Sequence, residues 1–396
     1  MEGSTPRSRR SGCSNLPRIL TVSQQLLSSP IRGEVVGSAS ILRRAVVIRA
    51  AASFDAVDDG RQRVFALSLV SSLHIGLDAG GSSTELLARA STGSLSSPKE
   101  ETRLQGDGAN PERSGHAEAV GTLAELVGEA VRRHPATQLR SVCAGVAGAG
   151  SGERRQALAG RLRRALGEVA PRARVRLVHD ARIALEAAFG NASGIIIIAG
   201  TGSAVFARTE AGTLERAGGW GYILGDEGSG YALGRAGLRA VARALDGGPA
   251  TRLQALLSNT YGANSRAALV GNVYEAELPL QEAAQAVLEA AAEGDAVAAR
   301  ILDEQTDALA RQVAWLAERE ATIAPQVVLF GGLTKNAHYV ETLGRAVRGA
   351  LSANCSVQPA SCPPVAGALR LALREDPGRE AASNAPEAPP VVSLCA

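Results

Sequence analysis

The sequence predicts an α/β protein in which one plan of strands and helices occurs twice. The stretch 73–88, LHIGLDAGGSSTELLA, reads as an apolar strand, a turn rich in glycine, serine and threonine, and a second apolar strand. The stretch 194–207, GIIIIAGTGSAVFA, repeats this plan with a run of four isoleucines. Stretches with helical apolar spacing alternate with further short strands. Two such hairpins in successive α/β segments indicate a duplicated fold.

Between and after the hairpins, the apolar spacing predicts the other elements in order. The stretch 116–134 has helical spacing and ends before Pro135, which the interior of a helix does not tolerate. Asp295 precedes the longest helical stretch, 296–320, and is expected to cap it. Further helices are predicted at 152–167, 181–189, 231–244, 251–273, 280–292, 336–353 and 363–373. Further strands are predicted within 139–149 and at 174–178 and 326–330.

The first turn has the composition of an anion-binding loop. Gly80 and Gly81 let the backbone approach a bulky ligand, and bare N–H groups in such a turn form an anion-binding concavity. Asp78, at the end of the strand, can hold a metal ion directly or through water. The turn also carries the hydroxyl donors Ser82, Ser83 and Thr84. Alone, the stretch fits an ordinary hairpin loop equally well. With the second turn, it indicates a nucleotide held between two halves.

A series of short motifs runs in order from about residue 73 to about residue 373. They are DAGGSST at 78–84, GANP at 108–111, Asp180 after a strand, GTGS at 200–203, GGWGY at 218–222, GDEGS at 225–229 and GGLTK at 331–335. By these motifs the chain resembles the superfamily of sugar kinases, Hsp70 and actin. More narrowly, it resembles the N-acetylglucosamine kinases and the BadF/BadG/BcrA/BcrD ATPases. The block 218–231 is the most specific part of the resemblance.

The resemblance implies two ribonuclease-H-like domains of the actin-like ATPase type, with mixed sheets around an interdomain cleft. We expect a first α/β domain at 73–190 and a second, with a helical insert, at 191–362. A helix at 363–374 is expected to return to the first domain, and residues 375–396 read as a disordered tail. Residues 1–72 lie outside the resemblance. They are rich in arginine and serine, and they fit a disordered extension, upstream sequence from an early start codon, or an organellar transit peptide.

Asp180 follows a strand, at the edge where ligands bind in α/β sheets. Phosphorylation of a sugar hydroxyl needs a carboxylate within hydrogen-bond reach to accept the proton. In the kinases that the chain resembles, the matching aspartate is the catalytic base, which implies this role for Asp180. The alternative is an aspartate that caps the following helix. His179 is expected to pack or to orient its neighbour rather than to bind a ligand.

The resemblance also implies a sugar site. Trp220 can offer an apolar face to a pyranose ring, and Asp226 or Glu227 can accept hydrogen bonds from sugar hydroxyls. The implied substrate-binding residues are Asn110, Ser203, Gly219, Trp220, Gly221 and Asp226. Two alternatives stay open. Asn110 can serve its own turn, and Asp226 or Glu227 can cap the helix that follows.

ATP and Mg²⁺ are the implied co-substrate and cofactor, with Asp78 as the expected metal ligand. The residues implied to contact ATP are Gly80, Gly81, Ser82, Ser83, Thr84, Gly200, Thr201, Gly202, Ala291, Gly331 and Lys335. Lys335 is one of two lysines in the chain, and its alternative role is that of a solvated loop residue. The first turn departs from the family at Ala79, where glycine is usual, and at Ser83, where a basic residue is usual.

These residues predict an ATP-dependent kinase acting on the 6-hydroxyl of an amino sugar, first of all N-acetylglucosamine. Muramic-acid sugars and glucosamine are alternatives. A rival of another class is the ATPase activator of 2-hydroxyacyl-CoA dehydratases and benzoyl-CoA reductases, which holds an iron–sulfur cluster between subunits through cysteines. The cysteines here show no suitable pair. A third alternative, a non-catalytic sugar sensor, is disfavoured because Asp180 is retained.

The composition limits the binding partners and the cellular compartment that we expect for this protein. A net charge of +3 gives no strong electrostatic attraction to nucleic acid or to a membrane surface. The apolar runs are too short to span a bilayer. Five cysteines without zinc spacing fit a reducing cytoplasm. We therefore expect a cytoplasmic enzyme of a small-molecule sugar, with no nucleic-acid or membrane partner. A homodimer stays open.

Overall fold

The computed structural model describes residues 52–58, 63–69, 71–91 and 101–375. The chain divides into two units, residues 1–70 and 71–396. In the first unit, β1 (Ala52–Asp58) and β2 (Arg63–Leu69) pair as antiparallel strands. The sequence predicts disorder here, and these two strands depart from that expectation. The predicted extension before residue 52 and the predicted tail after residue 375 lie outside the described residues.

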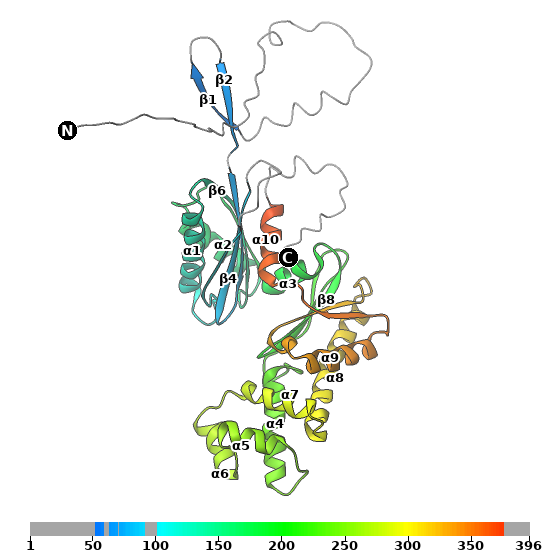
Figure 1. The fold of residues 1–396 in the computed structure, drawn as a ribbon. Helices are drawn as coiled ribbons and strands as arrows, with labels where there is room; N and C mark the ends of the chain where they lie inside the picture. Colours follow the sequence, from blue (N-terminus) through cyan, green and yellow to red (C-terminus); the bar gives the residue numbers. More distant parts are fainter. Residues whose placement is uncertain (1–51, 59–62, 70, 92–100, 376–396) are drawn as a thin grey trace, which may run out of the picture. The chain divides into compact units, whose positions relative to one another are not determined.

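The second unit begins with a five-stranded mixed sheet (Figure 1). Its strands are β3 (Ser71–Ala79), β4 (Ser83–Ser91), β5 (Glu101–Asp107), β6 (Thr137–Val146) and β7 (Arg174–His179). The spatial order is β5-β4-β3-β6-β7, in which β3, β4 and β5 are antiparallel and β6 and β7 continue parallel to β3. The predicted first hairpin is confirmed, because Ala79 lies opposite Thr84 across its turn.

The second sheet repeats this plan. Its strands are β8 (Gly194–Ala199), β9 (Ser203–Arg208), β10 (Leu214–Gly218), β11 (Gln326–Phe330) and β12 (Ser356–Pro359). The order is β10-β9-β8-β11-β12, again with three antiparallel strands followed by two parallel ones. Each sheet therefore places its opening strand at the centre, between its hairpin partner and a parallel strand. The predicted duplicated α/β fold is confirmed.

Three helices belong to the first sheet: α1 (His116–Arg133), α2 (Gly152–Ala165) and α3 (Asp180–Phe189). In α1 the buried residues Val120, Leu123 and Val127 recur at helical spacing. The Ser151 hydroxyl caps α2 by accepting a hydrogen bond from the Arg154 N–H at 3.4 Å. Helix α3 follows β7 without a loop, which puts the first residue of α3 at the carboxyl end of a strand.

A helical region lies between β10 and β11 in the sequence. It comprises α4 (Gly230–Leu245), α5 (Leu253–Tyr261), α6 (Arg266–Val270), the π-helical turn η4 (Gly271–Glu275), the 3₁₀ turn η5 (Leu280–Ala283), α7 (Ala284–Ala292) and α8 (Ala296–Arg319). Asp295 caps α8 as predicted, accepting the N–H groups of Val297 and Ala298. After β11 come the 3₁₀ turn η6 (Gly332–Lys335) and α9 (Ala337–Ala350).

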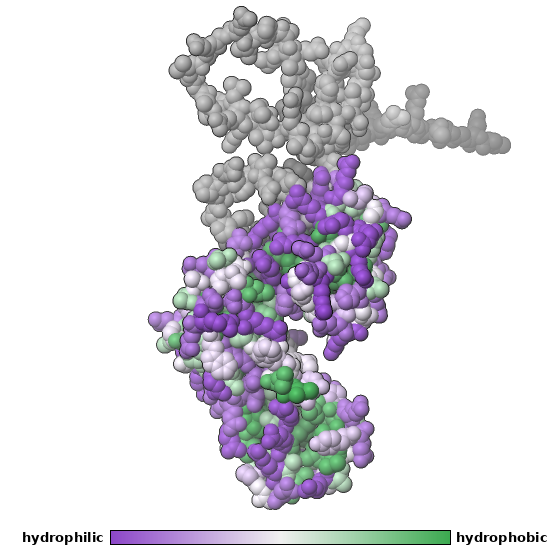
Figure 2. Space-filling model, turned by 180° about the vertical axis from the view of Figure 1, so that it is seen from behind, coloured by the Kyte–Doolittle hydropathy of each residue, from purple (hydrophilic) through white to green (hydrophobic). Residues whose placement is uncertain are grey.

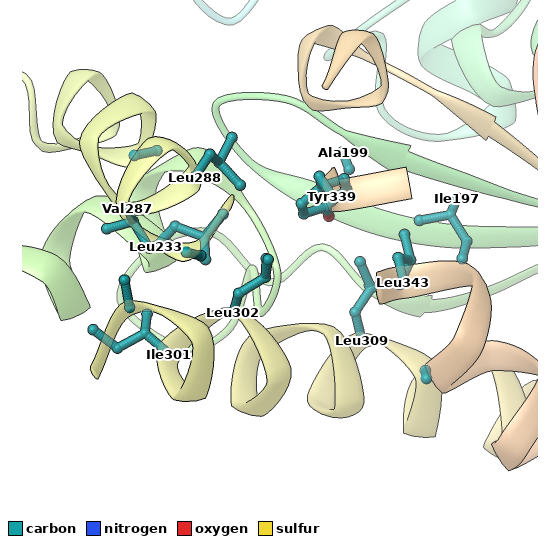
Figure 3. Packing of buried hydrophobic residues seen from close by; sticks show 14 of the residues in the cluster. Ile197, Ala199, Leu233, Val287, Leu288, Ile301, Leu302, Leu309, Tyr339 and Leu343 are labelled. Atoms are coloured by element: carbon teal, nitrogen blue, oxygen red, sulfur yellow. The ribbon is translucent and has the colours of Figure 1, made fainter. Parts of the chain in front are cut away.

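The core of the second half joins its sheet to these helices (Figure 3). Apolar side chains from β8, α4, α7, α8 and α9 meet there, among them Ile197, Ala199, Leu233, Val287, Leu288, Ile301, Leu302, Leu309, Tyr339 and Leu343. The Tyr339 hydroxyl is buried and donates to the Gly228 carbonyl oxygen at 2.7 Å. This bond ties α9 to the glycine-rich loop before α4.

The last helix, α10 (Pro364–Arg374), packs on β3 and α3 and lies beside α3 in Figure 1. The sequence predicts a terminal helix that returns to the first domain. A side chain at Gly76 would meet the Leu369 backbone, and one at Gly367 would meet the Ile183 carbonyl oxygen. Helix α10 therefore approaches both neighbours backbone to backbone.

Hydrophilic residues cover most of the coloured surface on the face drawn in Figure 2. Among the described residues, no helix is both long enough and apolar enough to cross a bilayer.

Candidate active site

The first turn is closed by a backbone hydrogen bond from the Gly80 N–H to the Ser83 oxygen, at 3.0 Å. Ser82 and Ser83 are exposed, so a ligand can reach their hydroxyls. Thr84 is fully buried, and within the described residues its Oγ1 has no hydrogen-bond partner. Ser82 and Ser83 are thus the accessible hydroxyls of the turn.

The loop that carries Asn110 rests on this turn. The Ala109 N–H donates to the Gly80 oxygen at 3.1 Å. Asn110 accepts the Glu112 N–H through Oδ1 at 2.9 Å, and its carboxamide packs against Gly148. The side-chain oxygen of Asn110 therefore forms a hydrogen bond within its own turn, which is one of the two alternatives that the sequence left open. The Nδ2 donors are the part of Asn110 for which the described residues supply no hydrogen-bond partner.

Asp78 and Asp180 come together at the carboxyl ends of β3 and β7. The pKa of Asp78 is raised from 3.8 to about 7. Burial is the largest cause, and the nearby charges of Asp180 and Glu85 supply the rest of the rise. Glu85 lies directly opposite Asp78 in the β3–β4 register. Three carboxyl groups thus share one region, where a cation would relieve their mutual repulsion.

Asp180 is held by its sequence neighbours. Its Oδ1 lies 2.6 Å from the His179 Nδ1 and accepts the Ala181 N–H at 2.8 Å. The same Nδ1 lies 3.2 Å from the Ala181 nitrogen, but the shorter contact assigns the imidazole proton to the bond with the carboxylate. The His179 ring packs against Phe206 at a centroid distance of 5.2 Å.

The environment keeps Asp180 ionised. Burial on its own raises the pKa of this carboxyl, but the hydrogen bond and charge of His179, the Ala181 N–H and the charge of Arg216 outweigh it and leave the pKa below 3.8. The N-cap position of α3 belongs to His179, and Asp180 is the first residue of the helix. Asp180 is therefore an ionised carboxylate at neutral pH.

The second turn lies against the start of α4 and against the loop after β11. The N–H groups of Gly230 and Tyr231 donate to the oxygens of Gly200 and Thr201, at 2.8 and 3.1 Å. Gly331 has a φ of 105°, and a side chain there would meet the Ala199 carbonyl oxygen. Two of the sequence motifs, at 200–203 and 331–335, therefore lie side by side.

Asp226 connects the second turn with the tryptophan loop, residues 219–225. Its Oδ1 accepts the Gly221 N–H at 3.1 Å, and a side chain at Gly202 would lie 2.6 Å from its Oδ2. Burial raises the pKa of Asp226, Glu227 adds to the rise, and hydrogen bonds from the Gly221 and Ser203 N–H groups oppose it. Helix α4 is capped by Ser229 and not by Asp226, so the capping alternative is wrong for this residue.

The other predicted residues differ in accessibility. Trp220 is 75% exposed, and its indole ring is open to a ligand. The Ser203 hydroxyl is occupied, because it donates to the Glu227 oxygen at 2.6 Å. Ala291 is buried on α7 in the core of the second half. Lys335 is exposed, and the described residues offer it no ion pair.

Two further residues shape this region, and the sequence analysis does not single them out. Arg216 donates from Nε to the Gly218 oxygen at 3.1 Å and also bonds the Gly219 oxygen. Its guanidinium lies 5.4 Å from the Phe206 ring centroid, and its charge acts on both Asp180 and Asp226. Gln312 donates to Glu227 at 2.7 Å from the buried face of α8. Gln312 could have been noticed in the sequence, because it is a polar residue on a mostly apolar face of a predicted helix.

The donor set suits a magnesium ion that shares its coordination with phosphates. In the described part of the chain, no group of three or more His, Cys, Asp or Glu side chains is arranged to hold a metal ion. Mg²⁺ usually takes one or two protein carboxylates and completes its octahedron with phosphate and water oxygens. Asp78, with neighbours that repel its charge, fits the role of a single carboxylate ligand.

The chain is similar to proteins that are named as amino-sugar kinases. An N-acetylmuramic acid/N-acetylglucosamine kinase of Clostridium acetobutylicum is 31% identical over 274 residues, which are 67% of this chain and 87% of the relative. An N-acetyl-D-glucosamine kinase of Dictyostelium discoideum is 30% identical over 47% of this chain and 59% of its own length. A crystal structure from Chromobacterium violaceum, provisionally assigned as an N-acetylglucosamine kinase, superposes with a TM-score of 0.55 at 26% identity, covering 77% of this chain and 99% of that one.

The family model described as the BadF/BadG/BcrA/BcrD ATPase family matches residues 75–372. This range contains both sheets except for the first residues of β3, together with both turns, Asp180 and the tryptophan loop. The chain belongs to the BadF/BadG/BcrA/BcrD ATPase family.

Proposed function

We propose that the protein is an ATP-dependent kinase that transfers the γ-phosphoryl group to the 6-hydroxyl of an amino sugar, most directly N-acetylglucosamine. The observation that carries this proposal is the ionised Asp180, held by His179 at a strand end beside Asp78. The family and the names of its relatives support ATP use and an amino-sugar substrate.

Asp180 acts as the general base. Its carboxylate accepts the proton of the 6-hydroxyl as the hydroxyl oxygen forms a bond to the γ-phosphorus and the bond from that phosphorus to the ADP oxygen breaks. The products are the sugar 6-phosphate, ADP and one proton. His179 keeps the carboxylate oriented for this transfer. Asp78 would hold the Mg²⁺ ion, which would supply positive charge to neutralise the phosphates.

The remaining residues position the two substrates. The first and second turns, with Gly331 and Lys335, bind ATP. Trp220 packs on the sugar ring, and Asp226 and the Asn110 Nδ2 group bind its hydroxyls. Ser203 and Thr84 support the second and first turns from inside, because the Ser203 hydroxyl is occupied and that of Thr84 is buried.

A second candidate substrate is an acidic amino sugar of the muramic-acid type. A neutral sugar needs no cation, yet Arg216 lies close enough to Asp180 and Asp226 for its charge to act on both. Its bonds to the oxygens of Gly218 and Gly219 place it beside the tryptophan loop. A carboxylate substituent on the sugar would find a partner in this guanidinium.

The activator ATPase remains the rival of another class. Such activators hold an iron–sulfur cluster between subunits through cysteines. The two free cysteines of the described part, Cys143 and Cys355, are both buried. Burial raises the pKa of the Cys143 thiol to about 12, which disfavours the thiolate that would ligate iron.

The experiment is sugar-dependent ADP release with N-acetylglucosamine, N-acetylmuramate, glucosamine and glucose, with the product identified by mass. Turnover with an amino sugar and a mass gain of one phosphate supports the kinase. An N-acetylmuramate preference that Arg216→Met removes identifies the acidic substrate. ATP hydrolysis that none of the four sugars changes contradicts the kinase and favours the activator.

A further inference from the structure

A cavity of about 500 Å³ lies between α2, β7 and α3, apart from the residues proposed to bind ATP and sugar. We call it the arginine pocket, because Arg155, Arg163, Arg176 and Arg182 line it together with His179. Its other lining residues are uncharged, and no aspartate or glutamate is among them. Four guanidinium groups around one cavity make a strongly positive environment.

Most of this charge is not neutralised by the protein. The Arg163 Nη2 donates to the Val175 carbonyl oxygen at 3.2 Å, and Arg155 bonds the Gly150 oxygen. Both bonds fix the side chain but leave its charge uncompensated. Arg176 is paired with Glu375 at 2.8 Å. Arg182 is half-buried, and within the described residues it forms no ion pair. Three of the four arginines therefore lack an acidic partner in the described part of the chain.

The arrangement suits a phosphate group. The N–H donors of a guanidinium lie in one plane, at a spacing that matches two phosphate oxygens. Several guanidinium groups around one site favour a dianion over a monoanion. Gly152, the first residue of α2, also lines the cavity, so the positive end of a 14-residue helix dipole adds to the field. The volume is in the range of ligand pockets for small molecules.

We propose that the arginine pocket is a second binding site, for a phosphate dianion that is either free or a monoester. Free phosphate and a sugar phosphate carry the same chemistry, and the test below distinguishes them. Helix α2 contributes two of the four arginines, Arg155 and Arg163.

The pocket is coupled to the proposed chemistry through one residue. His179 lines the pocket and also bonds Asp180. Leu214, on edge strand β10 of the second sheet, also lines the pocket. An occupant therefore contacts the residue that orients the base and sits between the edges of the two sheets. We expect occupancy to lower kcat, a consequence that rests on the proposed kinase function.

The binding test is isothermal titration calorimetry of the full chain, saturated with ADP, against inorganic phosphate and, separately, N-acetylglucosamine 6-phosphate. The variants are Arg182→Gln and the double variant Arg163→Gln, Arg182→Gln. Arg164→Gln is the matched control for Arg182→Gln, because it removes the same single charge from exposed α2 surface outside the pocket. Unfolding temperatures of all variants establish that they fold.

We expect saturable binding in the wild type, weakened about tenfold or more in the double variant and within about twofold of wild type in the control. Tighter binding of the sugar phosphate that is lost in the double variant identifies an ester as the ligand, because binding of this product at the proposed active site would survive in that variant. Equal binding of the two probes identifies free phosphate. Equal weakening in Arg164→Gln, or undiminished binding in the double variant, overturns the site. Inhibition of turnover by phosphate at saturating ATP and sugar, lost in the double variant, tests the coupling. Because calorimetry needs no turnover, failure of the kinase proposal would leave the binding result intact.

Discussion

At the scale of single residues, His179 sets the basicity of Asp180. Its hydrogen bond and charge stabilise the carboxylate, so their removal should raise the pKa of Asp180. We predict that His179→Ala moves the acid limb of the pH profile of kcat/KM to higher pH at saturating Mg²⁺. His116→Ala, which removes an exposed histidine, should leave the limb in place. An unshifted limb in His179→Ala would show that the imidazole does not act on the base.

Asp78 should make the stability of the metal-free protein depend on pH. Its pKa rises from 3.8 in the unfolded chain to about 7 in the fold, so the folded state binds the proton more tightly. The folded state therefore loses stability as pH rises from about 4 to about 7. We predict that Asp78→Asn raises Tm in a chelating buffer, and that this gain grows across the same window. A gain that shrinks with rising pH would contradict the burial and charge repulsion described for Asp78.

Individual site residues were predictable to different degrees. Asp78 lies at the end of a strand and Asp180 follows one. Ligands bind at strand ends in α/β folds, so their position alone made them candidates. Arg216 carries no such signal, because its contacts with Phe206 and Gly219 arise only when β9 and the tryptophan loop are folded. The occupied hydroxyl of Ser203 and the buried side chain of Ala291 likewise follow from tertiary packing.

At the scale of elements, α10 depends on two glycines that allow close backbone contact. A methyl group at Gly367 would collide with the Ile183 carbonyl oxygen, and this backbone cannot move aside cheaply. We predict that Gly367→Ala lowers the free energy of unfolding by about 1–3 kcal/mol, measured by urea denaturation. Gly121→Ala on α1 meets no neighbouring atom within 4 Å and should be neutral or stabilising by up to about 1 kcal/mol. Equal effects of the two substitutions would contradict the close packing of α10.

Most elements were predicted from the sequence, but three strands of the second unit were missed: β5, β10 and β12. Strand β5, ETRLQGD, alternates between exposed and half-buried positions and has no apolar face. It becomes a strand because β4 offers it an edge. Strand β12 has four residues and lies beside β11 in the same way. Short edge strands of this kind depend on pairing more than on propensity.

At the scale of the whole molecule, the two sheets share one strand order. The two hairpins in the sequence predict this duplication. The core residues of the described chain lie between Leu73 and Ala372. We predict that a protein starting at Ser71, after an initiator methionine, keeps the unfolding temperature and the sugar-dependent turnover of the full chain. Loss of either would show that residues 1–70 contribute to the second unit.

The grouping of charges is the part of the whole molecule that the sequence did not reveal. The arginines of the arginine pocket come from α2, β7 and α3, and their spacing along the chain has no pattern. Only the packing of α2 beside β7 brings them around one cavity. Motifs of contiguous residues were therefore visible in the sequence, whereas this cluster of arginines from separate elements was not.

The most direct test of the central claim compares sugar-dependent ADP release by the wild type and Asp180→Asn, with Asp303→Asn on the exposed face of α8 as control. We predict that Asp180→Asn lowers kcat by about 10²–10⁴-fold while the control retains wild-type turnover. Turnover that survives in Asp180→Asn at the wild-type rate would contradict the assignment of Asp180 as the base.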